Sequence, residues 1–199
     1  MKKLLQISLL IIFLANSLNA TISEQQELKD KFLKKIDTII SIVKDKSLSK
    51  DKRNSKIVTE LTPMFDFELM AKLSLGKKWK QLNKKDRKRF VKLYVERMKK
   101  SYSSKLDAYS DEKVEITDIK QPKKHSKISK LQLITNLVNK DKKLKIIYKF
   151  YKPKKQKPNK NRWLIYDVVI EGISILKADK AQFRAYLQDK SIYDLMNSF

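Results

Sequence analysis

The spacing of the apolar residues changes near the middle of the chain, and this change limits the folds that the sequence can adopt. Before about residue 105, apolar side chains recur every three or four residues, as they do along one face of a helix. From about residue 113 they alternate with polar residues, as they do along one face of a β-strand. Helices followed by consecutive strands predict an α+β fold in which an antiparallel sheet packs against helices.

Four helical segments are expected in the first half of the chain. Pro63 ends the second of them, because a proline disfavours the helical conformation in the residue before it. Asp66 is placed to cap the third helix and Gly76 to end it. The expected helices cover about residues 28–43, 49–62, 65–75 and 83–102.

The second half predicts a twisted antiparallel sheet of about four strands. Residues 143–150 alternate strictly, which indicates one apolar face and one mainly solvated face. Residues 163–170 are apolar on both faces apart from Asp167, which indicates a central strand that is covered on both sides. The other expected elements are strands at about 114–119 and 131–138 and a last helix at about 180–197.

The first twenty residues have the order that is typical of a secretory signal peptide. Lys2 and Lys3 precede a largely apolar stretch, and a small, polar region then ends at Ala20. An apolar run of about a dozen residues is too short to span a ~30 Å hydrocarbon core comfortably. We therefore expect residues 1–20 to be cleaved after Ala20, an uncleaved anchor being the alternative. Residues 21–199 are then expected to form one domain in the bacterial periplasm.

A large positive charge suggests an anionic partner. The chain has 47 basic residues, of which Lys2 and Lys3 belong to the expected signal peptide, so 45 remain against 22 acidic residues. Such an excess attracts nucleic acid or anionic lipid surfaces. Export argues against nucleic acid as the natural partner. Because the lysines are spread through every segment, a general enrichment in lysine is an equally good explanation of the charge.

Most groups that catalysis requires are missing from the sequence. The absence of cysteine excludes disulfides, cysteine nucleophiles and cysteine metal sites. The single histidine, His125, lies among lysines without a carboxylate nearby in the sequence to orient it. Gly76 and Gly172 are too far apart to form a phosphate-binding loop. We expect no enzyme, no catalytic residue, no metal and no cofactor; a hydrolase that uses His125 is the least favoured alternative.

Two stretches of the sequence resemble a known family. The first runs from Phe65 to Gly76 (FDFELMAKLSLG) and is followed by Trp79. The second, residues 163–174 (WLIYDVVIEGIS), is followed by Phe183. Together they resemble the MlaC family, also called toluene-tolerance auxiliary proteins, and the likeness extends in element order over nearly all of the chain. Two lysine-rich segments, 120–130 and 152–161, carry no recognisable family residues.

The resemblance implies a periplasmic phospholipid carrier rather than an enzyme. Members of the family hold lipid tails in a hydrophobic cavity, with the headgroup near its mouth. They pass lipid between an outer-membrane lipoprotein–porin complex and an inner-membrane ABC transporter with its MCE-domain partner, which maintains outer-membrane lipid asymmetry. Two acyl chains of about sixteen carbons contain about thirty methylenes, each contributing ~0.8 kcal/mol on burial. Exposing these methylenes to water forfeits that energy and so forms a barrier to movement of the lipid between the membranes. A protein that shields the tails removes this barrier without making or breaking a bond.

Under this hypothesis the cargo is a phospholipid, and the protein is a monomer that does not bind nucleic acid. The expected pocket combines the apolar sheet faces with the opposing stripe of the long helix. Its lining is predicted to be Tyr94, Met98, Tyr102, Ile146, Tyr148, Phe150, Leu164, Tyr166 and Val168. Structural roles are expected for Phe65, Asp66, Gly76, Trp79 and Gly172.

Two alternatives to this hypothesis stay open. Each predicted lining residue is also explained as ordinary core, because periodicity does not distinguish a pocket from a core. The alternative function is a secreted cationic protein that binds anionic membrane surfaces or glycans through its lysine-rich loops, without an internal ligand.

Overall fold

The computed structural model describes residues 2–106, 113–122, 130–139, 142–153 and 163–199. The chain divides into two compact units, Met1–Thr38 and Ile39–Phe199. The first unit consists of the greater part of one helix, α1 (Lys2–Lys44), which includes the expected helical segment 28–43. Among the described residues, no helix is both long enough and apolar enough to cross a membrane.

Along the sequence of the second unit, helices come both before and after the strands of the sheet. The helical elements before the sheet are α2 (Lys50–Leu61), η1 (Thr62–Met64), α3 (Phe67–Leu75), η2 (Gly76–Gln81) and α4 (Lys84–Leu106). The strands are β1 (Lys113–Lys120), β2 (Lys130–Asn139), β3 (Lys142–Tyr151), β4 (Leu164–Ile170) and β5 (Ile173–Ser174). Two helices follow, α5 (Ile175–Tyr186) and α6 (Ile192–Asn197).

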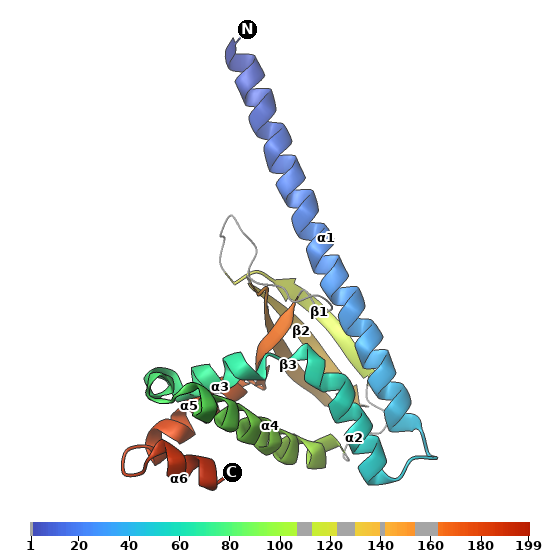
Figure 1. The fold of residues 1–199 in the computed structure, drawn as a ribbon. Helices are drawn as coiled ribbons and strands as arrows, with labels where there is room; N and C mark the ends of the chain where they lie inside the picture. Colours follow the sequence, from blue (N-terminus) through green and yellow to red (C-terminus); the bar gives the residue numbers. More distant parts are fainter. Residues whose placement is uncertain (1, 107–112, 123–129, 140–141, 154–162) are drawn as a thin grey trace. The chain divides into compact units, whose positions relative to one another are not determined.

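The five strands form one antiparallel sheet in the order β1-β2-β3-β4-β5, which confirms the predicted α+β class (Figure 1). The sheet has one strand more than expected, because the two-residue β5 is too short to show a periodicity. A tight turn connects β4 to β5, and its central residues Glu171 and Gly172 have φ angles of 47° and 82°. Positive φ at both positions is characteristic of a type I′ hairpin turn. Ile173 therefore pairs directly with Ile170.

The ends of α3 confirm the predicted caps. The backbone N–H of Leu69 donates a hydrogen bond of 2.9 Å to Oδ1 of Asp66. Gly76 follows the helix with φ 57° and ψ −125°, a conformation that residues with a Cβ rarely adopt. These ends fix the length of α3, the helix that packs against β4 and α5.

The prediction of one last helix at 180–197 is wrong, because two helices occupy this region. The first, α5, begins earlier than expected, where Lys177 N–H donates to the Ser174 hydroxyl oxygen (3.1 Å). The second, α6, begins at a capping box in which Ser191 and Asp194 each bind the backbone N–H of the other. A capping box starts a new helix and so separates α6 from α5.

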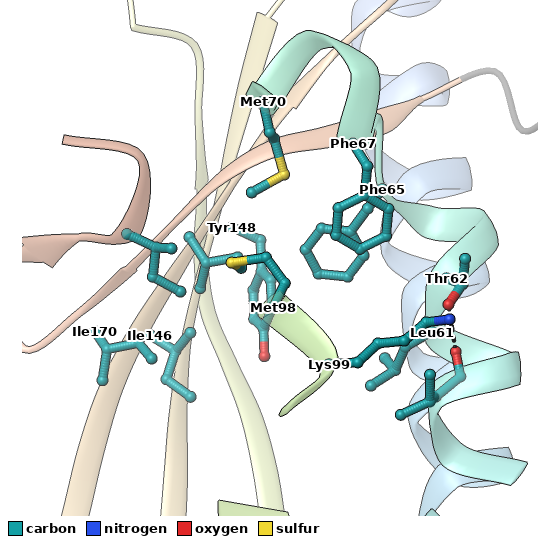
Figure 2. Close-up of a pocket in the computed structure, with 13 residues that line it drawn as sticks. Leu61, Thr62, Phe65, Phe67, Met70, Met98, Lys99, Ile146, Tyr148 and Ile170 are labelled. Carbon is teal, nitrogen blue, oxygen red and sulfur yellow. Dashed lines mark hydrogen bonds between the residues drawn. The ribbon is translucent and has the colours of Figure 1, made fainter. Parts of the chain in front are cut away.

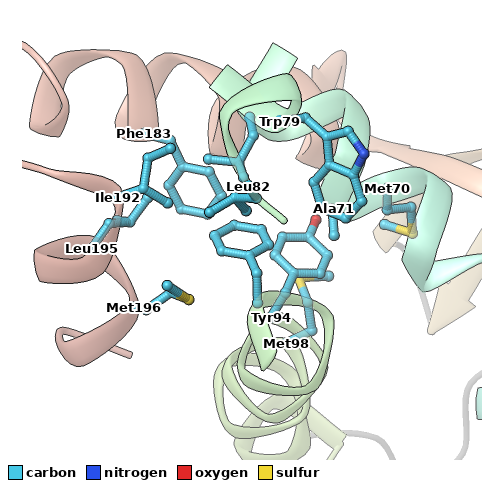
Figure 3. Close-up of a cluster of buried hydrophobic side chains, with 12 residues drawn as sticks. Met70, Ala71, Trp79, Leu82, Tyr94, Met98, Phe183, Ile192, Leu195 and Met196 are labelled. Atoms are coloured by element: carbon cyan, nitrogen blue, oxygen red, sulfur yellow. The ribbon is translucent and has the colours of Figure 1, made fainter. Parts of the chain in front are cut away.

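The main hydrophobic core joins α3, η2 and α4 to the C-terminal helices, and Figure 3 shows these side chains converging. Phe90 and Phe183 are both almost completely buried, and their rings meet edge to face with centroids 6.0 Å apart. The other core members are Met70, Ala71, Leu75, Trp79, Leu82, Tyr94, Met98, Ile192, Leu195 and Met196. This core holds α3 and α4 at fixed positions beside the sheet.

Candidate functional site

A pocket of about 240 Å³ lies within the second unit, between the helices α2, α3 and α4 and the face of the sheet formed by β3 and β4 (Figure 2). Its lining is almost entirely aliphatic and aromatic, as is common for binding sites of small apolar ligands. The lining residues are Val58, Leu61, Thr62, Phe65, Phe67, Met70, Met98, Lys99, Ile146, Tyr148, Val168, Ile170 and Ile175.

The sheet side of the pocket follows from strand register. Tyr148 on β3 lies opposite Val168 on β4, and Ile146 lies opposite Ile170. Because side chains alternate along a strand, all four project from the same face of the sheet. The register thus brings together apolar residues from two strands as one wall.

Lys149 belongs to the opposite face of the sheet, as its position between Tyr148 and Phe150 requires. Its Nζ lies 2.8 Å from Oδ2 of Asp167, which is only 2% exposed. Asp167 also accepts hydrogen bonds from the Ser174 hydroxyl (2.8 and 2.9 Å) and the Leu176 N–H (3.1 Å). This buried carboxylate ties β3 and β4 to the start of α5.

The segment before α3 forms part of the helical wall because it is hydrogen-bonded to β4. Phe65 makes an isolated parallel bridge with Ile165, and the N–H of Asp66 donates to the Ile165 carbonyl at 2.9 Å. The hydroxyl of Tyr151 donates a short hydrogen bond to Oδ2 of Asp66. Phe65 stacks on Phe67 with ring centroids 5.3 Å apart, and both rings line the pocket. Phe65, expected to be structural only, is thus a lining residue as well.

Two methionines form part of the pocket wall. Met70 on α3 and Met98 on α4 are 0% and 8% exposed, and both line the pocket. A methionine side chain is unbranched and polarisable, so it adopts different rotamers at small energetic cost. This property suits a pocket for flexible, variable hydrocarbon chains.

Few polar groups reach the pocket. The Thr62 hydroxyl donates to the carbonyl of Val58 at 2.6 Å, which uses its one donor. Tyr148 adds a second hydroxyl to the lining. Of the described residues that line the pocket, Lys99 alone carries a formal charge. Its Nζ lies 3.1 Å from Oε1 of Glu96, one turn earlier on α4, and its side chain is 36% exposed. The pocket is therefore apolar inside, with one cation at its edge.

The structure brings together some of the residues predicted from the sequence and separates others. Met98, Ile146, Tyr148 and Val168 line the pocket. Tyr94 lies in the main core, one helical turn from Met98.

The other predicted lining residues lie outside the pocket or outside the description. Phe150 and Leu164 are buried away from it. Tyr166 packs edge to face on Tyr151 with ring centroids 5.9 Å apart, and burial raises the pKa of its hydroxyl. Tyr102 is on α4, but its side chain lies outside the described residues.

Several lining residues were not predicted from the sequence. Ile170 was detectable, because it continues the alternation that begins at Val168. No pattern distinguishes Val58 and Leu61 from the other apolar residues of α2. The remaining unpredicted lining residues are Thr62, Phe65, Phe67, Met70, Lys99 and Ile175.

The described part of the chain contains no evident metal site. Among those residues, no group of three or more histidine, aspartate or glutamate side chains is arranged to hold a metal ion. His125, and most of the two lysine-rich segments, lie outside the described residues. The pocket itself is lined mainly by apolar side chains.

Comparison with known proteins finds a matching family and a similar fold. The family model described as "MlaC protein" matches residues 33–199. The fold is similar to that of a phospholipid-binding protein from Ralstonia solanacearum, whose structure was solved in complex with a phospholipid. The TM-score is 0.64 at 16% sequence identity, over 77% of this chain and 83% of that one. No protein of curated function matches the chain significantly.

Proposed function

Because the chain belongs to the MlaC family, we propose that it is a phospholipid carrier that holds acyl tails in the pocket between α2–α4 and the sheet. The observation that carries this proposal is the lining, in which aromatic, aliphatic and methionine side chains surround about 240 Å³ within an MlaC-like fold. The phospholipid in the Ralstonia solanacearum protein supports the same class of ligand.

Apolar lining favours lipid tails over polar small molecules for a thermodynamic reason. Each methylene that moves from water into such a pocket gains ~0.8 kcal/mol. A polar ligand would instead lose hydrogen bonds to water that this lining does not replace. The volume lies just below the ~300–1,000 Å³ that enclose a drug-sized ligand. We therefore expect the pocket to take part of the tails as it stands and the adaptable methionines to make room for more.

The cellular role that we propose follows from the family. Residues 1–20 act as a signal peptide, and residues 21–199 act as a monomeric carrier in the periplasm. The carrier exchanges phospholipid with an outer-membrane lipoprotein–porin complex and with an inner-membrane ABC transporter that carries an MCE domain. It makes or breaks no covalent bond and needs no cofactor.

Native mass spectrometry of the protein purified from the periplasm tests the proposal. We expect a phospholipid to remain bound through washing at high salt, because apolar burial does not weaken as ionic strength rises, whereas surface charge attraction does. A lipid that is lost at high salt would indicate the alternative, a cationic surface binder. A protein without lipid that takes up none from vesicles would contradict both the carrier and its pocket.

A matched pair of substitutions locates the lipid. Ile170 lines the pocket, whereas Ile173, its direct partner across the hairpin, is 68% exposed. Ile170→Trp places a large ring in the pocket and is expected to reduce the bound lipid several-fold. Ile173→Trp makes the same chemical change at the surface and should leave the lipid unchanged. Equal lipid content in both folded variants would show that the tails lie elsewhere.

A further inference from the structure

Lys99 combines two surroundings that match the two parts of a phospholipid. Its side chain helps to line the apolar pocket, while its Nζ forms an ion pair of 3.1 Å with Glu96, whose own side chain is 60% exposed. The hydrocarbon stem of a lysine commonly covers apolar surface while the ammonium group remains in contact with water. Lys99 therefore marks the boundary at which the apolar interior of the pocket ends and solvent begins.

We propose that the Lys99 ammonium group binds the phosphodiester of a lipid whose tails occupy the pocket, and so makes the site select phospholipids over uncharged lipids. This proposal rests on the proposed function and adds a determinant of lipid class to it. An ammonium group donates charge-assisted hydrogen bonds to phosphate oxygens, which are stronger than those between neutral groups.

Among the described lining residues, Lys99 alone offers a cation to a phosphate. The hydroxyls of Thr62 and Tyr148 are neutral donors, and that of Thr62 already donates to Val58. Glu96 is the carboxylate that holds Lys99 in place. Its ion pair is solvent-exposed and therefore contributes little to stability. A phosphodiester that is tethered by its tails at the same mouth has a high effective concentration there and can replace that carboxylate.

A competition experiment tests the proposal with the full mature protein. Vesicles offer equimolar phosphatidylglycerol and diacylglycerol with identical acyl chains, and the protein is then re-isolated. The ratio of bound phosphatidylglycerol to bound diacylglycerol is measured by mass spectrometry. For Lys99→Gln we expect this ratio to fall about fivefold, which is the range of a partly exposed ion pair. Uptake of diacylglycerol should stay at the wild-type level, which shows that the pocket is intact.

Three variants make the result specific. Lys100→Gln removes the same charge from the next, exposed residue of α4 and should leave the ratio unchanged. Lys99→Arg keeps the cation and should preserve the selectivity. Glu96→Gln removes the competing carboxylate and should raise the ratio. An unchanged ratio in Lys99→Gln, or an equal fall in Lys100→Gln, would overturn the proposal.

Two further observations separate this proposal from its premises. If the wild-type protein takes up neither lipid, the proposed carrier function fails. If it takes up both without preference, only the role of Lys99 fails. A free anion is distinguished by repeating the exchange with millimolar inorganic phosphate at constant ionic strength. We expect no change in the ratio; loss of selectivity would show a site for free phosphate and overturn the assignment to a lipid headgroup.

Discussion

The Tyr94 hydroxyl donates a hydrogen bond of 2.7 Å to Oδ2 of Asp179, which joins α4 to α5 inside the main core. Both side chains are buried, at 0% and 5% exposure. The other oxygen of the carboxylate, Oδ1, lies 2.8 Å from Nη1 of Arg97. The guanidinium group also lies 5.3 Å from the centroid of the Phe183 ring. A buried carboxylate is thus satisfied on both oxygens, and Tyr94 acts in the core beside the pocket.

Tyr94→Phe is expected to lower the free energy of unfolding by about 1.5–3 kcal/mol, because it removes a buried hydrogen bond to a charged group. Urea denaturation measures this change. Tyr193→Phe is the matched control, since its hydroxyl bonds Asp86 at 2.9 Å but its side chain is 50% exposed. That variant should change stability by less than about 0.5 kcal/mol.

Bound lipid gives the second measurement on Tyr94→Phe. Because Tyr94 lies outside the pocket, we expect the lipid content of the folded variant to equal that of the wild type. A loss of lipid without a loss of stability would instead assign Tyr94 to the lipid-binding surface, as the sequence predicted.

Asp167 and Lys149 form a part-buried ion pair whose members should respond unequally to substitution. Asp167→Ala leaves Lys149, the Ser174 hydroxyl and the Leu176 N–H without their acceptor. We expect it to destabilise the protein by about 3–5 kcal/mol. Lys149→Met should have a smaller effect, about 1–2 kcal/mol, because Asp167 keeps two other donors.

A double-mutant cycle measured by urea denaturation tests this difference. We expect the double variant to be no less stable than Asp167→Ala alone, because a lysine without its partner contributes nothing favourable. Effects that add would show that the two residues stabilise the protein independently.

Gly76→Ala is expected to destabilise the protein through the backbone and not through a clash. An added Cβ would lie 3.6 Å from Cε of Lys180, which is an ordinary van der Waals distance. The φ of 57° is instead strained for alanine, at a cost of about 1–3 kcal/mol. Thermal and urea denaturation measure the loss. If Lys180→Ala restored stability in the double variant, the cause would be steric and this explanation would be wrong.

The order and type of most elements could be predicted from the sequence because they depend on local patterns. The apolar stripe of α4 and the alternation of β3 each fit one periodicity, and Asp66 and Gly76 mark the ends of α3. The break between α5 and α6 was missed although its capping box, Ser191 with Asp194, is present in the sequence. The polar residues 188–191 also interrupt the helical spacing of apolar side chains between Leu187 and Ile192, so the break was detectable from the sequence.

The pocket could be predicted only in part, because a cavity depends on distances between elements. Tyr94 and Met98 occupy the same stripe of α4, yet the first lies in the core and the second also lines the pocket. Phe65 reaches the pocket through a bridge to Ile165, a residue one hundred positions later in the chain. No periodicity within a segment carries information about such a long-range pairing.

Tyr151 should make stability fall at high pH. Burial of the phenol, the hydrogen bond that it donates to Asp66 and the charges of Asp66 and Glu68 hold the pKa of Tyr151 well above its ordinary value of 10.0. Above about pH 10 the unfolded chain therefore loses this proton while the folded protein keeps it. The unfolded state then binds fewer protons, so the free energy of unfolding decreases as pH rises.

Tyr151→Phe isolates this contribution, because the two proteins differ in no other titratable group. At pH 8 the wild type should be more stable by about 1 kcal/mol, owing to the hydrogen bond to Asp66. Between pH 10 and 11 this advantage should shrink, by less than the full ~1.4 kcal/mol per pH unit because the side chain is partly exposed. Urea denaturation at pH 8, 9, 10 and 11 measures the difference. An advantage that stays constant or grows across this range would mean that Tyr151 ionises in the folded protein as readily as in the unfolded chain.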